Sequence, residues 1–277
     1  MYTTLIDTAT LFSLDKNNLV IVDCRFSLAD VAYGSLAYAR EHIPGAIYTS
    51  LDDDLSGPPL TDHGRHPLPS PEALMALFDY MGICKDTQVV AYDDANGMIA
   101  SRLWWMLRYM GHTAVSVLDG GWQAWQEAEL PTIHGIESPS TALFKDCPGG
   151  SPHREWLALH DEIPNAPLLI DSRKAERYRG EIEELDLIAG HISGAVNYFY
   201  ERNWDENGRY LPKATIKAQF EKLLGDTPVE DVIIYCGSGV SSCVNLLAMA
   251  YAGMGNGRLY VGSWSEQCYL QLNNEKA

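Results

Sequence analysis

Residues 232–242 read VIIYCGSGVSS, which is a run of strand-forming residues, a cysteine and a short loop of small residues. The first four residues predict a buried β-strand, and the composition of 242–250 is compatible with a helix. Cys236 is therefore expected at the carboxyl end of a strand, facing a helix N-terminus. Inward backbone N–H groups and the positive end of the helix dipole both favour a thiolate there. A buried structural cysteine at a strand end is the alternative reading of this stretch alone.

The composition is that of a folded globular protein. The chain has 277 residues, enough for one large domain or two of ordinary size, and 46% of them are hydrophobic. No apolar run approaches the roughly 18–20 residues of a membrane span. The N-terminal residues lack the basic and apolar segments of a secretory signal, so we expect a cytoplasmic protein.

The net charge is −17, with 37 acidic residues against 20 basic ones. Nucleic acids and anionic membranes need clustered Lys and Arg, so neither is expected as a partner. An anionic substrate would have to be attracted locally, against the overall field. The six cysteines are scattered without a C-x-x-C pair, which indicates neither a zinc site nor a thioredoxin-type motif. We expect free thiols, no metal and no cofactor.

The two halves of the chain carry the same landmarks in the same order, and the first two landmarks are offset by 148 to 149 residues. Each landmark of the first half has a partner in the second: LVIVDCR at 19–25 with LLIDSR at 168–173, HIPGAI at 42–47 with HISGAV at 191–196, and VVAYD at 89–93 with IIYC at 233–236. Asp93 falls where Cys236 falls. This repetition predicts a duplicated domain.

Each half alternates short apolar strands with helical stretches, a pattern typical of an α/β fold with a parallel sheet and helices on both faces. The segment 131–155 is rich in glycine and proline and is predicted to be a linker. We therefore expect a non-catalytic domain at 1–130 with Asp93 at the cysteine position, and a catalytic domain at 156–277. Because one copy has a carboxylate and the other a thiol, the simplest account is that only Cys236 retains chemistry.

These paired segments, together with WWMLR at 104–108, LDGG at 118–121 and GSWSE at 262–266, resemble the two-domain rhodanese family of sulfurtransferases. The resemblance covers nearly the whole chain apart from the linker. It implies that Cys236 takes a sulfane sulfur from a small anionic donor, becomes a persulfide, and passes the sulfur to cyanide or a thiol. The loop CGSGV at 236–240 resembles the 3-mercaptopyruvate type, because the thiosulfate type usually carries basic residues directly after the cysteine.

A persulfide anion needs several N–H donors, and the backbone of the loop after Cys236 is expected to supply them. The loop residues predicted to line the sulfur site are Gly237, Ser238, Gly239, Val240 and Ser241. The resemblance places the substrate-binding arginine at Arg177, with Arg179 as the alternative. A guanidinium suits the carboxylate or thiosulfonate of a donor. The following stretch, 181–186, is acidic and lacks the second arginine expected for the 3-mercaptopyruvate type, so both donors stay open.

The resemblance also implies a proton relay of Asp54, His66 and Ser238. Histidine suits this role because its ordinary pKa lies near neutrality. The alternative is that His66 only covers the site. Its neighbour Arg65 could instead provide positive charge.

Two other functions are alternatives to a persulfide-forming enzyme. A cysteine phosphatase needs an arginine six positions after its cysteine, and residue 242 is serine, so this class is disfavoured. A non-catalytic module that hands sulfur from Cys236 to a protein partner stays open, because the same cysteine and loop would serve it.

Overall fold

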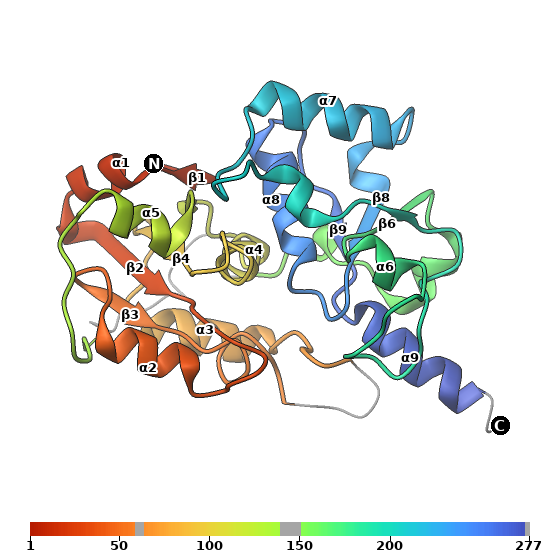
Figure 1. The fold of residues 1–277 in the computed structure, drawn as a ribbon, viewed down its shortest axis with the longest axis horizontal. Coiled ribbons are helices and arrows are strands. Elements are labelled where there is room, and N and C mark those ends of the chain that lie inside the picture. The colour runs from red at the N-terminus through yellow and green to blue at the C-terminus, as the bar shows by residue number, and fades with distance from the viewer. Residues whose placement is uncertain (59–63, 139–150, 275–277) are drawn as a thin grey trace. The chain divides into compact units, whose positions relative to one another are not determined.

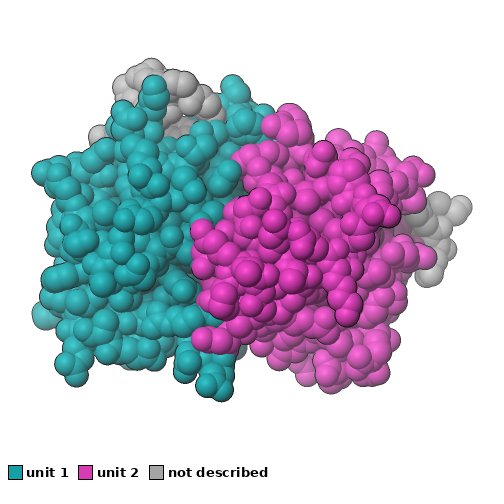
Figure 2. All heavy atoms as spheres, turned by 90° about the horizontal axis from the view of Figure 1, so that it is seen from above, with its two compact units in different colours: residues 1–55, 69–153, 206–209 teal, residues 56–68, 154–205, 210–277 magenta. Residues whose placement is uncertain are grey.

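The computed structural model describes residues 1–58, 64–138 and 151–274, which fall into two compact units. Unit 1 comprises the described residues of 1–55, 69–153 and 206–209, and unit 2 those of 56–68, 154–205 and 210–277 (Figure 2). Residues 139–150 of the predicted linker, with Cys147, lie outside the described residues. The domain bounds 1–130, 131–155 and 156–277 stay a prediction.

Unit 1 is built on a five-stranded sheet with the order β1-β5-β4-β2-β3, and every neighbouring pair is parallel. Its strands are β1 (Leu5–Ile6), β2 (Leu19–Asp23), β3 (Ala46–Tyr48), β4 (Gln88–Tyr92) and β5 (Val115–Leu118). Its helices are α1 (Thr8–Ser13), α2 (Tyr33–Arg40), α3 (Pro71–Tyr80), α4 (Ala100–Tyr109) and α5 (Gly121–Glu127), with the 3₁₀ turn η1 (Lys16–Asn18).

Unit 2 repeats this order with a four-stranded parallel sheet, β7-β6-β8-β9. Its strands are β6 (Leu168–Asp171), β7 (Val196–Asn197), β8 (Val232–Tyr235) and β9 (Arg258–Leu259). Leu157 pairs with Leu259 of β9 through an isolated parallel bridge. This pairing corresponds to that of β1 with β5 in unit 1. The helices are α6 (Ala175–Tyr178), α7 (Lys213–Leu224), α8 (Ser242–Tyr251) and α9 (Ser263–Asn274), with the 3₁₀ turns η3 (Arg154–Trp156), η4 (His160–Asn165), η5 (Tyr200–Asn203) and η6 (Val229–Asp231).

Parallel sheets flanked by helices confirm the predicted fold class (Figure 1). The central strands β4 and β8 are buried along their whole length, as expected of strands covered on both faces. In unit 2 the aromatic rings of Tyr260 and Trp264 pack with Ile233 and Tyr235 in one hydrophobic cluster. Among the residues that the structure describes, no helix is both long and apolar enough to span a membrane.

A buried ion pair stands at the end of β2 in unit 1 and at the end of β6 in unit 2, within the repeated segments 19–25 and 168–173. In unit 1, Arg25 Nη2 lies 2.6 Å from Asp23 Oδ2, and both side chains are buried. In unit 2, Arg173 Nη2 lies 2.7 Å from Asp171 Oδ2, again with both side chains buried. Each arginine also donates from Nη2 to a backbone carbonyl oxygen at 2.6 Å, that of Glu41 or Gly190. The pairs thus fix the segments that precede His42 and His191.

We expect Arg25→Met to lower the free energy of unfolding by about 3 kcal/mol, because the Asp23 carboxylate would stay buried without its partner. The measurement is urea denaturation followed by circular dichroism. Arg40→Met is the matched control, since Arg40 is exposed at the end of α2 and its loss should cost less than about 0.5 kcal/mol. Equal losses in the two variants would contradict a buried, stabilising pair.

Candidate active site

Cys236 lies at the carboxyl end of β8, six residues before α8 begins at Ser242. Its thiol is 2% exposed, and the loop that follows it is built from small residues. The first N–H groups of a helix have no partners within the helix, so α8 directs donors and the positive end of its dipole toward this loop. The position is the one predicted from the sequence.

Gly239 of the loop is required by a close backbone contact. Gly239 has a φ of +75°, and a β-carbon there would lie 2.5 Å from the carbonyl oxygen of Val261. A side chain at this position would therefore clash, in a backbone conformation that non-glycine residues rarely adopt. The result is a loop that turns tightly against the segment between β9 and α9.

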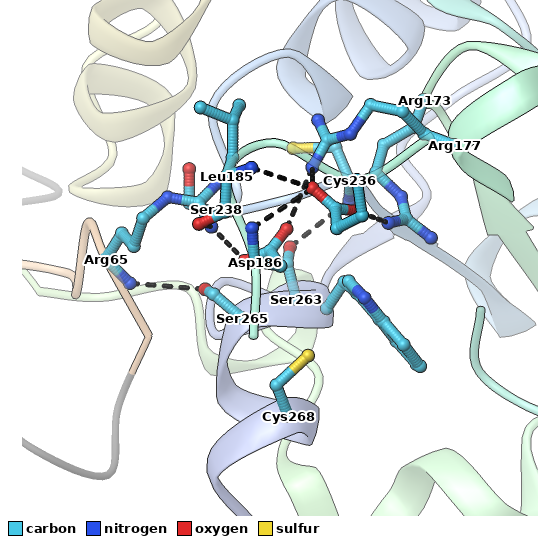
Figure 3. Close-up of polar contacts among 12 residues, drawn as sticks. Arg65, Arg173, Arg177, Leu185, Asp186, Cys236, Ser238, Ser263, Ser265 and Cys268 are labelled. Atoms are coloured by element: carbon cyan, nitrogen blue, oxygen red, sulfur yellow. Dashed lines mark hydrogen bonds and ion pairs between the residues drawn. The ribbon is translucent and has the colours of Figure 1, made fainter. Parts of the chain in front are cut away.

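The beginning of α9 binds two carbonyl groups of the cysteine loop. The N–H of Trp264 donates to the Cys236 carbonyl at 3.1 Å, and that of Ser265 donates to the Gly237 carbonyl at 2.9 Å. The Cys236 N–H donates to Ser263 Oγ at 3.2 Å (Figure 3). Because these carbonyls are held by α9, the N–H groups further along the loop are left to face the thiol.

The pKa of the Cys236 thiol is lowered from its ordinary value. Burial acts to raise it, but hydrogen bonds from the hydroxyls of Ser241 and Ser242 and from the backbone N–H groups of Ser238 and Ser242 outweigh burial. All four donors stabilise the thiolate rather than the thiol. The site therefore favours the nucleophilic form of the cysteine.

The corresponding loop of unit 1 holds a carboxylate in the same kind of pocket. Asp93 follows β4 and is fully buried. Its two oxygens accept the N–H groups of Ala95, Gly97, Ile99 and Ala100 at 2.7–2.8 Å. The strand-to-helix junction of this fold is thus an anion pocket made of backbone amides.

The structure brings His66 and Ser238 together within unit 2. His66 Nδ1 lies 2.7 Å from Ser238 Oγ, and both side chains are buried. Asp54, the third member of the predicted relay, belongs to unit 1. Its carboxylate accepts hydrogen bonds from the Ser50 N–H at 2.7 Å and from Thr49 Oγ1 at 3.3 Å. The contact between Asp54 and His66 stays a prediction.

Two arginines of unit 2 lie against the loop. A β-carbon on Gly237 would stand 2.9 Å from Arg65 Nη2 and 3.7 Å from both Nη atoms of Arg177. Arg177 pairs with Glu183 at 2.7 Å and with Asp186 at 2.9 Å, and Arg65 also pairs with Asp186 (Figure 3). Arg179 is half exposed and pairs with Glu181 at 2.6 Å. Of the two predicted substrate-binding arginines, Arg177 is the one beside the cysteine loop.

Ser242 and Asp186 were not among the site residues predicted from the sequence, and Arg65 was named there only as a possible source of positive charge. The Ser242 hydroxyl acts to lower the pKa of the Cys236 thiol, although the sequence marked residue 242 only as the missing phosphatase arginine. Arg65 and Asp186 meet through an ion pair between segments 121 residues apart, and no local pattern could reveal it.

Among the described residues, no cluster of three or more His, Cys, Asp or Glu is arranged to hold a metal ion.

Comparisons with known proteins agree with this geometry. The model of the rhodanese-like domain matches twice, over residues 11–128 and 154–268. The chain is 41% identical over 256 residues to a probable 3-mercaptopyruvate sulfurtransferase of Pseudomonas aeruginosa, covering 91% of this chain and 90% of that protein. It is 38% identical over 253 residues to a putative thiosulfate sulfurtransferase of Mycobacterium tuberculosis, covering 89% and 86%.

Among solved structures, the 3-mercaptopyruvate sulfurtransferase of Leishmania major superposes with a TM-score of 0.86 at 30% identity, covering 97% of this chain and 75% of that one. The fold and the cysteine loop define a protein with two rhodanese-like domains. The chain belongs to the rhodanese family of sulfurtransferases, which confirms the resemblance seen in the sequence.

We expect Ser242→Ala to raise the pKa of the Cys236 thiol, because a neighbouring hydroxyl that lowers this pKa is removed while the burial of the thiol is unchanged. Titration of the ultraviolet thiolate absorbance, with the Cys236→Ser spectrum subtracted, measures it. The wild-type midpoint should lie below the ordinary value of about 8.5, and the variant midpoint above that of the wild type. Ser116→Ala, a buried hydroxyl of unit 1, is the control and should leave the midpoint unchanged.

Proposed function

We propose that the protein is a sulfurtransferase that moves a sulfane sulfur from 3-mercaptopyruvate or thiosulfate, through a persulfide on Cys236, to cyanide or a thiol. The observation that carries the proposal is a cysteine thiol whose pKa is lowered by converging hydroxyl and backbone donors. The family supports it, since relatives with both donors in their names match along most of the chain.

In the first half of the reaction, the Cys236 thiolate attacks the outer sulfur of the donor. A sulfur–sulfur bond to Cys236 forms, and the bond joining that sulfur to the rest of the donor breaks. The electron pair leaves with sulfite when the donor is thiosulfate, and with the enolate of pyruvate when it is 3-mercaptopyruvate. In the second half, the acceptor attacks the outer sulfur and the electron pair returns to Cys236 as thiolate.

The amide pocket suits the persulfide intermediate. The carboxylate oxygens of Asp93 extend one bond further from the backbone than a cysteine sulfur does, and four N–H groups of unit 1 reach them. By analogy, the outer sulfur of a Cys236 persulfide would take the place of those oxygens in unit 2. Backbone donors fixed in advance stabilise charge at that point without reorganisation.

The two donors differ in whether the leaving group must gain a proton. A pyruvate enolate must gain a proton, whereas sulfite leaves without one. The pair of His66 and Ser238, 2.7 Å apart beside the cysteine, supports a role as the proton source. We keep Asp54 in this proposal as the residue that orients His66.

Donor binding is assigned to Arg177 with Arg65. Both guanidinium groups lie against the Gly237 backbone, next to the cysteine. Within the described residues, the buried Nε of Arg177 has no hydrogen-bond partner, so it has a donor free for an anion.

We also propose that the protein acts in the cytoplasm. The five described cysteines are free thiols, which suits a reducing cytoplasm.

Cys236→Ala is expected to abolish sulfur transfer from either donor to cyanide, measured as thiocyanate formation. Treatment of wild type with donor alone should add the mass of one sulfur atom to the peptide containing Cys236. Cys84→Ser is the control, because Cys84 is exposed and belongs to unit 1, and it should keep full activity. Sulfur loading of Cys236 without turnover would instead indicate a sulfur carrier.

His66→Asn is expected to lower kcat with 3-mercaptopyruvate by roughly a hundredfold, the usual size of an acid–base contribution. With thiosulfate, kcat should change less than about threefold, because sulfite needs no proton to leave. Steady-state kinetics with the two donors gives the comparison. His160→Asn serves as the control, since His160 is an exposed histidine of the same unit. An equal loss with both donors would point to a packing role for His66.

A further inference from the structure

The two arginines beside the cysteine loop share one carboxylate. Oδ1 of Asp186 pairs with Arg65 Nη1, and Oδ2 pairs with Arg177 Nη2 at 2.9 Å. The Asp186 side chain is 2% exposed, so this contact is largely shielded from water (Figure 3). A carboxylate of the chain thus occupies the guanidinium groups that a donor's carboxylate or thiosulfonate would need.

The charges of this cluster cancel. Glu183 pairs with Arg177 at 2.7 Å and with Arg173 at 3.3 Å, and Arg173 pairs with Asp171 at 2.7 Å. With Arg65 and Asp186 included, the cluster therefore contains three arginines and three carboxylates. While Asp186 stays in place, the cluster offers no net positive charge to an anion, in a protein whose overall charge is already −17.

The two carboxylates of the acidic loop are held differently. Glu183 Oε1 accepts the backbone N–H groups of Leu185 and Asp186, each at 3.0 Å, and so shapes the turn itself. Both oxygens of Asp186, by contrast, are bound to arginine side chains. If a donor anion displaced the Asp186 carboxylate from the arginines, the turn held by Glu183 would stay intact.

The loop that carries Asp186 has little apolar anchoring. The side chains of Ile182, Leu185 and Leu187 are 50%, 46% and 64% exposed. Burial raises the pKa of Asp186, although Arg65 and Arg177 act to lower it, so the charged carboxylate is less favoured here than in water. The departure of Asp186 from the arginines therefore breaks no hydrophobic core.

From this geometry we propose that Asp186 is a specificity-determining residue. Its carboxylate competes with the donor for Arg65 and Arg177. This competition selects against donors that carry two negative charges. This inference rests on the sulfurtransferase function proposed above. An entering donor displaces the Asp186 carboxylate. Because electrostatic repulsion scales with the donor's charge, the dianion thiosulfate is penalised more than the monoanion 3-mercaptopyruvate.

Asp186→Asn removes this charge while keeping the shape of the side chain. We expect the KM for thiosulfate to fall roughly tenfold and that for 3-mercaptopyruvate to fall about threefold, since the free-energy change should be half as large for half the charge. The kcat values should change little, because Cys236 and its donors are untouched. Steady-state kinetics with both donors gives the four values.

Glu184→Gln is the matched control. It removes the same charge from an exposed position of the same loop, and both KM values should stay unchanged. An unchanged KM for thiosulfate in Asp186→Asn would overturn the proposal. So would a raised KM, which would mean that Asp186 positions the arginines for the donor. Asp186→Ser carries the same expectations if the asparagine variant does not fold.

Binding measured without turnover keeps this inference separate from the proposed function. In a Cys236→Ser background, calorimetric titration with thiosulfate should show a Kd roughly tenfold lower when Asp186 is asparagine. If the wild type shows no turnover but this shift appears, the sulfurtransferase proposal fails and the selection of anions by Asp186 stands. Equal Kd values would reject the role of Asp186 even if the enzyme turns over.

Discussion

Backbone N–H groups that converge where a parallel strand runs into a helix are the constraint on which this structure depends. Such groups must find a partner, and an anion is the partner they favour. In unit 1 the partner is the carboxylate of Asp93, buried with four N–H donors. In unit 2 it is the thiol of Cys236, whose pKa is lowered by the same kind of donors. One backbone design thus serves two side chains.

The second determinant is a balance of charge immediately outside that pocket. Arg65 and Arg177 bring positive charge to the cysteine loop, and Asp186 cancels part of it. A strongly acidic protein can attract a small anion only through such local cations, because its overall field repels anions. In the proposed mechanism, a few ion pairs control which anion enters, and the backbone stabilises the persulfide.

Much of the fold was predictable because its landmarks are local. The strand before Cys236, the glycine loop and α8 follow from residue types along a single stretch, and the structure confirms them. The repeated segments 19–25 and 168–173 were predicted as matching strands, and both end in the same buried ion pair. The pairing of His66 with Ser238 came only through the resemblance to a family, since 172 residues separate them. No periodicity connects such distant positions.

The sequence by itself determined the family, the two parallel sheets and the position of the reactive cysteine, because all three depend on short motifs repeated in order. Only the tertiary structure decided what surrounds that cysteine. It showed that the Gly237 backbone lies against Arg65 and Arg177, and that Asp186 binds both of these arginines. The physical reason is that electrostatic contacts depend on distance in space. Folding sets those distances between segments that the chain holds far apart.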